Sequence, residues 1–312
     1  MDDVPHVFIE SVLSDVSTIY PVTQLNPSSP WTYHAKLFSQ NLKHYQFCLK
    51  ISRTALQCYF GFFPIGTVVT SHTLSWREFV TTDKRYAKVN SIIVKTDLYP
   101  DKIDEMRWKD LQFEQVETVT RIALSRFSVA GPSKLVISED PRDLPNYKLL
   151  KKLTYKTLTQ KLFFNDLVLS HKGSKSEKFL KSQGNYGLNL EKLTLYGPWP
   201  QSTQDDLNKI VKLPNFSRLE AEDRNIQCVA KFAVIDELVK EWMADDSKTE
   251  KFFNVFIDDL DNNLPSYYKR EFYRELYIKL HVKPPKIVNL LICKITLINY
   301  VLKIKVRKTG KM

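Results

Sequence analysis

Glycine is scarce in this sequence, with 8 residues among 312. Sites that cradle phosphates or fold a loop closely around a ligand depend on glycine, because only glycine adopts left-handed backbone angles at little cost. The chain also contains no P-loop, no G-x-G-x-x-G and no G-x-S-x-G sequence. Catalytic groups can assemble from distant residues. With none of these local signatures present, we expect a protein that is not an enzyme.

Patterns of metal ligands are missing as well. No C-x-x-C and no H-E-x-x-H occurs, and none of the six histidines lies at ordinary ligand spacing from another. The cysteines are far apart and each lies among apolar residues: Cys48, Cys58, Cys228 and Cys293. Such cysteines are typical of buried free thiols in a reducing compartment. We expect no cofactor and no metal.

The sequence carries no recognisable secretory signal, since it begins Met1-Asp2-Asp3 rather than with a positive charge and an apolar run. Residues 287–302 are largely apolar but include Lys294. A membrane span needs about 20 residues, and a central lysine costs roughly 2.5–3.5 kcal/mol on insertion scales. We therefore interpret this segment as a buried strand or helix. The expected location is intracellular, cytoplasmic or nuclear, with no membrane partner.

The positive charge is concentrated at one end of the chain. The formal net charge is +11. Residues 276–312 contain no acidic residue and nine basic ones: Lys279, Lys283, Lys286, Lys294, Lys303, Lys305, Arg307, Lys308 and Lys311. The first 275 residues are therefore close to neutral and present no basic face. The simplest interpretation is a solvated basic end, without nucleic acid as the main partner. The alternative is a nucleic-acid-associated protein that acts through this tail.

The start of the chain has the spacing of a short helical unit, which we assign to residues 1–40. Pro5 is followed by Phe8, Val12 and Leu13 at helical intervals, and a proline-rich break leads to a second helical stretch from Trp31. Residues 41–112 form a strand-rich α/β region. In it, residues 45–51 alternate with period two, residues 55–63 form a second apolar run, and Ser75 caps a brief helix.

A recurring Φ-x-x-Φ-x-Φ phrase, where Φ is apolar, is the strongest pattern. Its copies are Val89/Ile92/Val94, Val119/Ile122/Leu124, Phe164/Leu167/Leu169, Leu190/Leu193/Leu195 and Phe216/Leu219/Ala221. The last three copies are 26 residues apart, a spacing typical of leucine-rich-type repeats with one strand and one helix each. We predict an α/β fold with leucine-rich-repeat-like strand–helix units, forming a curved, mainly parallel sheet over residues 113–265. An ordinary α/β or α+β domain is the alternative.

The segments between these strands have helical spacing. Ser202 and Asp205 have the spacing of a capping box before Leu207, Ile210 and Val211, and the segment that begins at Ser174 is a shorter version. Residues 230–243 are predicted as the longest helix, and residues 252–257 as a closing strand. Residues 266–312 are the basic apolar tail, which we expect to be poorly ordered.

Several of these features together resemble nematode proteins of the F-box and F-box-associated type. They are Val4-Pro5, Phe8, Val12 and Leu13 at the start, then Trp31, Leu193-Thr194-Leu195-Tyr196-Gly197-Pro198-Trp199-Pro200, Pro214-Asn215-Phe216 and Trp242. The resemblance covers about residues 1–260. It implies an F-box-like helical segment over residues 1–40 that binds the linker subunit of a cullin-RING ubiquitin ligase. It also implies a repeat region that recruits an unknown target protein.

The resemblance implies candidate partner-binding residues at the start of the chain, and the enrichment of tryptophan at interfaces adds one more. Pro5, Phe8, Val12 and Leu13 would insert into a groove of the ligase subunit. The alternative is that they form the apolar face of a terminal helix packed on the body. Trp199, between two prolines, is expected to be exposed on a loop as an interface anchor.

Overall fold

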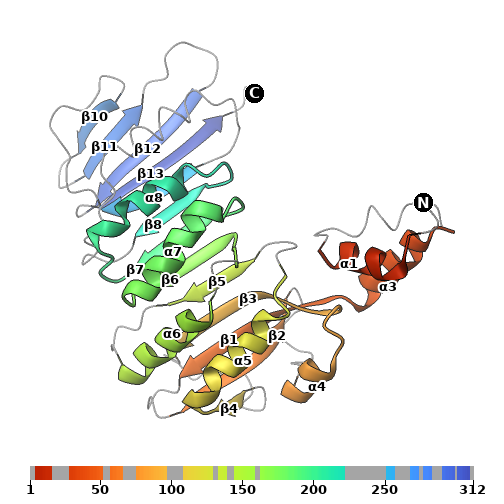
Figure 1. Ribbon diagram of the computed structural model, residues 1–312. Helices are drawn as coiled ribbons and strands as arrows, with labels where there is room; N and C mark the ends of the chain where they lie inside the picture. Colours follow the sequence, from red (N-terminus) through yellow and green to blue (C-terminus); the bar gives the residue numbers. More distant parts are fainter. Residues whose placement is uncertain are drawn as a thin grey trace. The chain divides into compact units, whose positions relative to one another are not determined.

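The computed structural model describes residues 4–15, 28–51, 57–65, 75–96, 108–128, 133–138, 144–158, 162–221, 251–256, 268–273, 277–282, 290–298 and 301–309. It shows a mixed α/β protein with mostly parallel strands through β8 (Figure 1). The chain divides into two compact units, residues 1–164 and 165–312. The boundaries expected after residues 40, 112 and 265 remain predictions.

The first unit begins with two helices, as the sequence predicts. Helix α1 spans His6–Asp15 and helix α3 spans Pro30–Asn41. Pro30 occupies the first turn of α3, where a missing N–H costs nothing, and the Ser29 hydroxyl accepts a hydrogen bond from the Trp31 N–H at 3.3 Å. The two helices pack on each other through apolar residues that the next subsection describes.

A five-stranded sheet follows in the first unit, in the order β5-β3-β1-β2-β4. Its strands are β1 (Lys43–Ile51), β2 (Cys58–Pro64), β3 (Ala87–Thr96), β4 (Lys109–Leu111) and β5 (Lys134–Ile137). Strands β1, β3 and β5 are parallel to one another, whereas β2 pairs antiparallel with both β1 and β4. The two strands predicted at residues 45–51 and 55–63 are thus confirmed, and they pair with each other.

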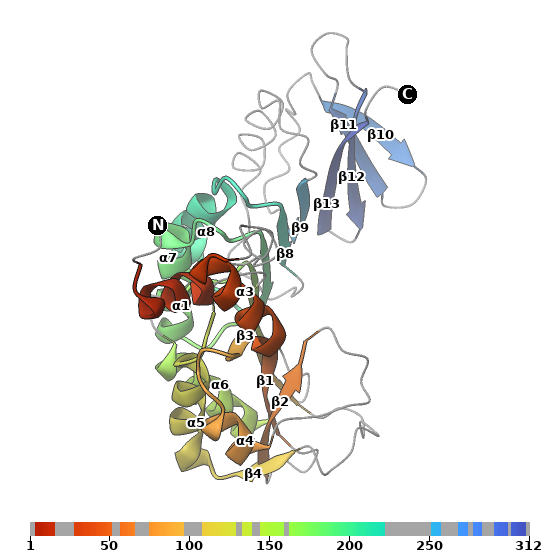
Figure 2. The ribbon, with the colours of Figure 1, turned by 90° about the vertical axis from the view of Figure 1, so that its right-hand side faces the viewer.

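Four helical segments accompany this sheet: α4 (Trp76–Thr81), η2 (Phe113–Gln115), α5 (Val116–Leu124) and α6 (Pro145–Thr157). Helices α5 and α6 lie side by side on one face of the sheet (Figure 2). The predicted cap of α4 is confirmed. The Ser75 hydroxyl accepts a hydrogen bond from the Glu78 N–H, and the Glu78 carboxylate accepts one from the Ser75 N–H.

One copy of the repeated phrase was assigned to the wrong element. Val119, Ile122 and Leu124 belong to helix α5 and not to a strand. The buried residues of α5 are Val116, Val119, Thr120 and Ala123, which is the i, i+3, i+4, i+7 spacing of a helix face. The Φ-x-x-Φ spacing is compatible with one face of a helix as well as with the residues that lead into a strand. Here the helical interpretation is correct.

The first copy of the phrase is in a strand as predicted. Val89, Ile92 and Val94 are all buried in β3. Their spacing of three and then two residues arises from a register shift. Tyr45 pairs with Val89 while Gln46 pairs with Ser91, so Asn90 is an extra residue that returns Ile92 to the buried face.

The second unit contains the 26-residue repeat. Strands β6 (Asp166–Ser170), β7 (Lys192–Tyr196), β8 (Arg218–Ala221) and β9 (Lys251–Phe256) are neighbours in that order and parallel. Leu167 pairs with Leu193, and Leu193 pairs with Leu219. All three leucines are buried. The last three copies of the phrase are therefore strands, stacked in register, and the closing strand predicted at residues 252–257 corresponds to β9.

Helices α7 (Ser174–Tyr186) and α8 (Gln204–Val211) connect these strands and pack against each other. The two helices approach each other closely at Gly184, where an added Cβ would lie 3.1 Å from the Asp206 carbonyl oxygen. The predicted apolar face of α8 is confirmed, because Leu207, Ile210 and Val211 are buried.

Two predicted helix starts in this unit were wrong. Ser202 lies in a 3-10 turn, η3 (Gln201–Thr203), and α8 begins after it without a side-chain cap. Helix α7 is preceded by Gly173, whose φ of 71° suits glycine, so Ser174 is its first residue and not its cap. The helix predicted at residues 230–243, with Trp242, lies outside the described residues.

Four antiparallel strands end the chain: β10 (Tyr268–Tyr273), β11 (Tyr277–Val282), β12 (Leu290–Ile298) and β13 (Val301–Thr309). Strand β13 pairs with β9 and joins them to the parallel strands of this unit. Of the two interpretations of residues 287–302, the structure has a strand. Within the described ranges, no helix has the length and apolar character to cross a membrane.

Candidate partner-binding surface

The N-terminal helix pair has a buried interior. Ile9 and Leu13 of α1 and Ala35 and Phe38 of α3 are each 0% exposed. The ring of Phe38 meets the ring of Tyr86 edge-on at 5.1 Å between centroids. Burial of these side chains stabilises the pair and also docks it on the turn that precedes β3.

A charged network reinforces this docking. Arg85 pairs with Glu10 of α1 and with Asp83 of the turn, and the Arg85 Nε lies 2.8 Å from the Asp83 Oδ2. These hydrogen bonds from Arg85 lower the pKa of Asp83 and raise the pKa of Arg85 itself. Both groups therefore stay charged throughout the neutral pH range.

Two histidines connect α1 with α3. The Nδ1 of His6 lies 2.7 Å from the Nε2 of His34, whose Nδ1 lies 3.5 Å from the Glu10 carboxylate. His34 is buried. Among the described residues, no group of three histidine, cysteine or acidic side chains is arranged to hold a metal ion. The histidine pair thus joins the two helices by a hydrogen bond.

The outer surface of the pair is apolar and exposed. Val7 is 77%, Phe8 is 55% and Tyr33 is 64% exposed. The rings of Phe8 and Trp31 meet edge-on, with 6.4 Å between their centroids. We call Val7, Phe8 and Tyr33 the apolar patch of the helix pair. Exposed large apolar side chains on a pair of packed helices are candidates for an interaction site.

The structure separates the four residues predicted to bind at the N-terminus. Pro5 and Phe8 are exposed, Val12 is half-buried and Leu13 is fully buried. Val7 and Tyr33 were not among the predicted residues, because both lie off the helical spacing of Phe8 and Val12. Leu13 follows the alternative interpretation, in which the apolar residues form the packed face of the helix.

The predicted exposure of Trp199 was wrong. This side chain is 0% exposed, its Nε1 donates a hydrogen bond to the Tyr196 carbonyl at 3.0 Å, and its ring meets His171 at 5.2 Å. Gly197, with a φ of 82°, turns the chain so that Trp199 folds back over the ends of β6 and β7. His171 is fixed in turn by Glu177, at 2.9 Å. Trp199 is therefore a core residue and not an anchor on the surface.

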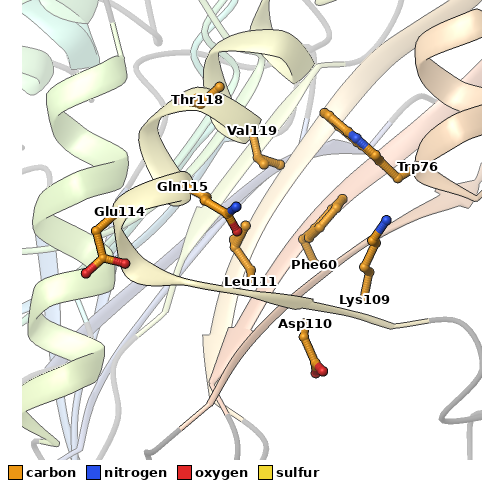
Figure 3. Close-up of a pocket in the computed structure, with 9 residues that line it drawn as sticks. All are labelled: Phe60, Trp76, Lys109, Asp110, Leu111, Glu114, Gln115, Thr118 and Val119. Carbon is orange, nitrogen blue, oxygen red and sulfur yellow. The ribbon is translucent and has the colours of Figure 1, made fainter.

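The first unit also has a pocket of about 310 Å³ between β2, α4, β4 and α5 (Figure 3). Phe60, Trp76, Leu111 and Val119 form its apolar part, and the Phe60 and Trp76 rings meet at right angles at 5.3 Å. The remaining lining residues are polar: Lys109, Asp110, Glu114, Gln115 and Thr118. The pocket thus has an apolar part and a polar part that includes Lys109, Asp110 and Glu114.

Comparison of the chain with models of protein families, with curated proteins and with solved structures gave no match. The class that the described residues define is a mixed α/β protein. Its function has to be argued from its own residues.

Proposed function

We propose that this chain is a protein-binding scaffold that acts as a substrate-recruiting adaptor of a cullin-RING ubiquitin ligase. In this proposal the helix pair α1–α3 binds the linker subunit of the ligase, and the strand–helix units hold the target protein. The chain works in the cytoplasm or nucleus by binding alone, without catalysis by its own residues.

One observation carries the proposal. The helix pair buries Ile9, Leu13, Ala35 and Phe38 inside and still exposes the apolar patch of Val7, Phe8 and Tyr33 outside. An aromatic side chain that is more than half exposed on a short helix is what helix-in-groove recognition uses as an anchor. The F-box-like pattern at Val4-Pro5 and Phe8 supports a ligase linker subunit as the partner.

The repeat supports the second half of the proposal. Leu167, Leu193 and Leu219 are in register at intervals of 26 residues, as expected for leucine-rich-repeat-like units. Stacked units of this kind offer an extended surface of strands and loops to a protein partner. The pocket beside Phe60 and Trp76 would accept an apolar side chain of the target.

The test is a pulldown of the full chain with a purified ligase linker subunit. The variant Val7→Ser/Phe8→Ser removes two residues of the apolar patch, and Tyr186→Ser/Leu188→Ser removes two apolar residues that are equally exposed in the second unit. We expect at least about tenfold weaker binding for the first variant, the loss that corresponds to roughly 1.4 kcal/mol, and unchanged binding for the second.

Circular dichroism establishes that all three samples are folded. Failure of the folded wild-type chain to bind the linker subunit overturns the ligase assignment. Equal binding by both variants means that the apolar patch is not the docking surface.

A further inference from the structure

The pocket of the first unit combines an apolar floor with hydrogen-bond donors at its rim. Phe60, Leu111 and Val119 are buried and form the floor. Lys109 and Gln115 are exposed at the rim. Figure 3 shows the Lys109 side chain extending beside Phe60 and the Gln115 amide pointing into the pocket. The site therefore offers room for an apolar side chain next to groups that attract an anion.

The two polar groups at the rim both act as donors toward a ligand. The Oε1 of Gln115 accepts a hydrogen bond from the backbone N–H of Gln112 at 3.3 Å. The NH₂ group of the Gln115 amide, with its two N–H donors, is thus the part available to a ligand. The ammonium of Lys109 adds three donors and a positive charge. Together these groups select a ligand whose oxygens are acceptors and carry negative charge, as in a carboxylate.

The two acidic side chains of the lining point away from the pocket. Asp110 pairs with Tyr59, whereas Lys109 pairs with Phe60. Because successive residues of a strand point to opposite faces, the Asp110 side chain lies on the other face of the sheet from Lys109 and Phe60. Figure 3 shows that the Glu114 carboxylate is directed away from the Phe60 ring. Lys109 therefore supplies the charge that faces the pocket.

The strand beside the pocket favours a polypeptide as the ligand. Strand β4 stands at the end of the strand order, and among the described strands it pairs with β2 alone. One edge of β4 is therefore without a neighbouring strand, and the backbone groups of such an edge can pair with an extended peptide. The last residue of a polypeptide carries its carboxylate and its side chain on the same carbon atom. An apolar last residue thus matches the donors and the apolar floor at once.

We propose that this pocket binds the carboxyl terminus of the target protein, with an apolar last side chain on the floor and the terminal carboxylate on Lys109 and Gln115. The inference rests on the proposed function, because it names the feature by which the adaptor selects its target. Selectivity follows from the two parts of the pocket. An internal segment of a protein lacks the terminal charge, and a polar last residue lacks the apolar group.

The experiment uses the full chain and mixtures of short peptides that are labelled with fluorescein at the amino end. The sequences are random except for a final leucine or phenylalanine. Each mixture is made as the free acid and as the C-terminal amide, which has nearly the same shape and no charge. Binding is measured by fluorescence anisotropy at low salt, without any ligase subunit. We expect the free acids to bind at least about tenfold more tightly than the amides and than free acids that end in serine.

Three variants with equal net charge test the assigned residues. Lys109→Gln removes the ammonium. Gln115→Glu keeps an oxygen that accepts from the Gln112 N–H and replaces the two donors with a negative charge. Lys152→Gln, at an exposed position of α6, is the control. We expect the first two variants to bind the free acids no more tightly than the amides, and the control to stay within about twofold of the wild type.

Equal binding of free acids and amides by the folded wild-type chain, or binding of neither, overturns the proposal. An equal loss in all three variants overturns it as well, because it shows dependence on net charge alone. Competition by hexanoate at the same concentration as the peptide acids assigns the pocket to a free apolar acid instead. Circular dichroism establishes that each variant is folded.

The same assay separates this proposal from the ligase assignment. The variant Val7→Ser/Phe8→Ser changes the apolar patch of the helix pair and leaves every residue of the pocket in place. It should bind the peptides as the wild type does. Loss of linker binding with peptide binding intact therefore concerns the ligase assignment, whereas the reverse result concerns the pocket.

Discussion

The carboxylate of Glu10 pairs with the guanidinium of Arg85, 75 residues further along the chain. This contact joins the N-terminal helix pair to the turn before β3. Among the described residues, this salt bridge and the Phe38–Tyr86 ring contact both join the ligase-binding surface that we propose to the turn before β3.

Replacing Arg85 with Gln should loosen the helix pair without unfolding the sheet. The ion pair is partly exposed, so its loss should cost at most about 1 kcal/mol. Hydrogen exchange measured by mass spectrometry should show faster exchange of α1 amides in Arg85→Gln, with the amides of β1 and β3 unchanged. Arg77→Gln, which alters an exposed cation of α4, serves as the control.

The same variant should change the acid dependence of stability. Arg85 lowers the pKa of Asp83 in the folded chain. Asp83 thus contributes stability that is fully present above its unfolded pKa, about 3.9, and is lost as the pH falls through the lower folded value. Urea unfolding at pH 7 and pH 3 should show a smaller loss of stability on acidification for Arg85→Gln. An identical loss would contradict this role of Asp83.

Leu13 and Phe8 should respond in opposite ways to truncation. Leu13 is fully buried in the helix pair, and Leu13→Ala should destabilise that pair by about 2–5 kcal/mol. Phe8 is 55% exposed, and Phe8→Ala should change the folding free energy by at most about 0.5 kcal/mol while it weakens partner binding. Chemical denaturation followed by circular dichroism measures both values. A large loss of stability in Phe8→Ala would show that it is a packing residue.

Truncation of a leucine in the buried series of the second unit should lower the folding stability. Leu193 is 0% exposed between Leu167 and Leu219, and Leu193→Ala should cost about 2–5 kcal/mol. Leu188, in the loop just before β7, is 65% exposed. Leu188→Ala should therefore stay within about 0.5 kcal/mol of the wild type. Thermal unfolding of the two variants, recorded side by side, tests this difference.

The two cysteines of the first sheet should be protected from alkylation. Burial raises the pKa of Cys48 to about 11 and that of Cys58 to about 12. At pH 8 both remain thiols, so iodoacetamide should modify them only after unfolding. The thiols of the unfolded chain lose their protons near pH 9. The free energy of unfolding should therefore fall as the pH rises from 9 toward 11. Mass spectrometry of native and urea-treated samples checks the modification, and rapid native labelling would contradict the burial.

Secondary structure was predicted correctly where the spacing of apolar residues fits only one kind of element. The strands around Leu167, Leu193 and Leu219 were found because residues two apart can face one core only in a strand. The same phrase failed at Val119, because a step of three residues also places two side chains on one face of a helix. The local pattern does not distinguish a helix from a strand at this position. The packing of α5 on the sheet determines that it is a helix.

The binding surface was harder to predict than the strands. Phe8 and Leu13 have the same helical signature, and only the position of α3 determines which of them faces Phe38. Trp199 was misplaced because flanking prolines indicate a loop, while the backward turn at Gly197 is a conformational detail that composition does not contain.

The equal interval between Leu167, Leu193 and Leu219 has a consequence for how this protein can change over evolution. A block of 26 residues spans one strand, one helix and their connections. Its duplication or deletion would preserve every pairing on either side. Insertions of other lengths have to be absorbed in loops, because a strand shifted by one residue turns its leucines away from the core. The second unit can therefore lengthen its sheet in whole steps, each adding one strand width of about 4.8 Å.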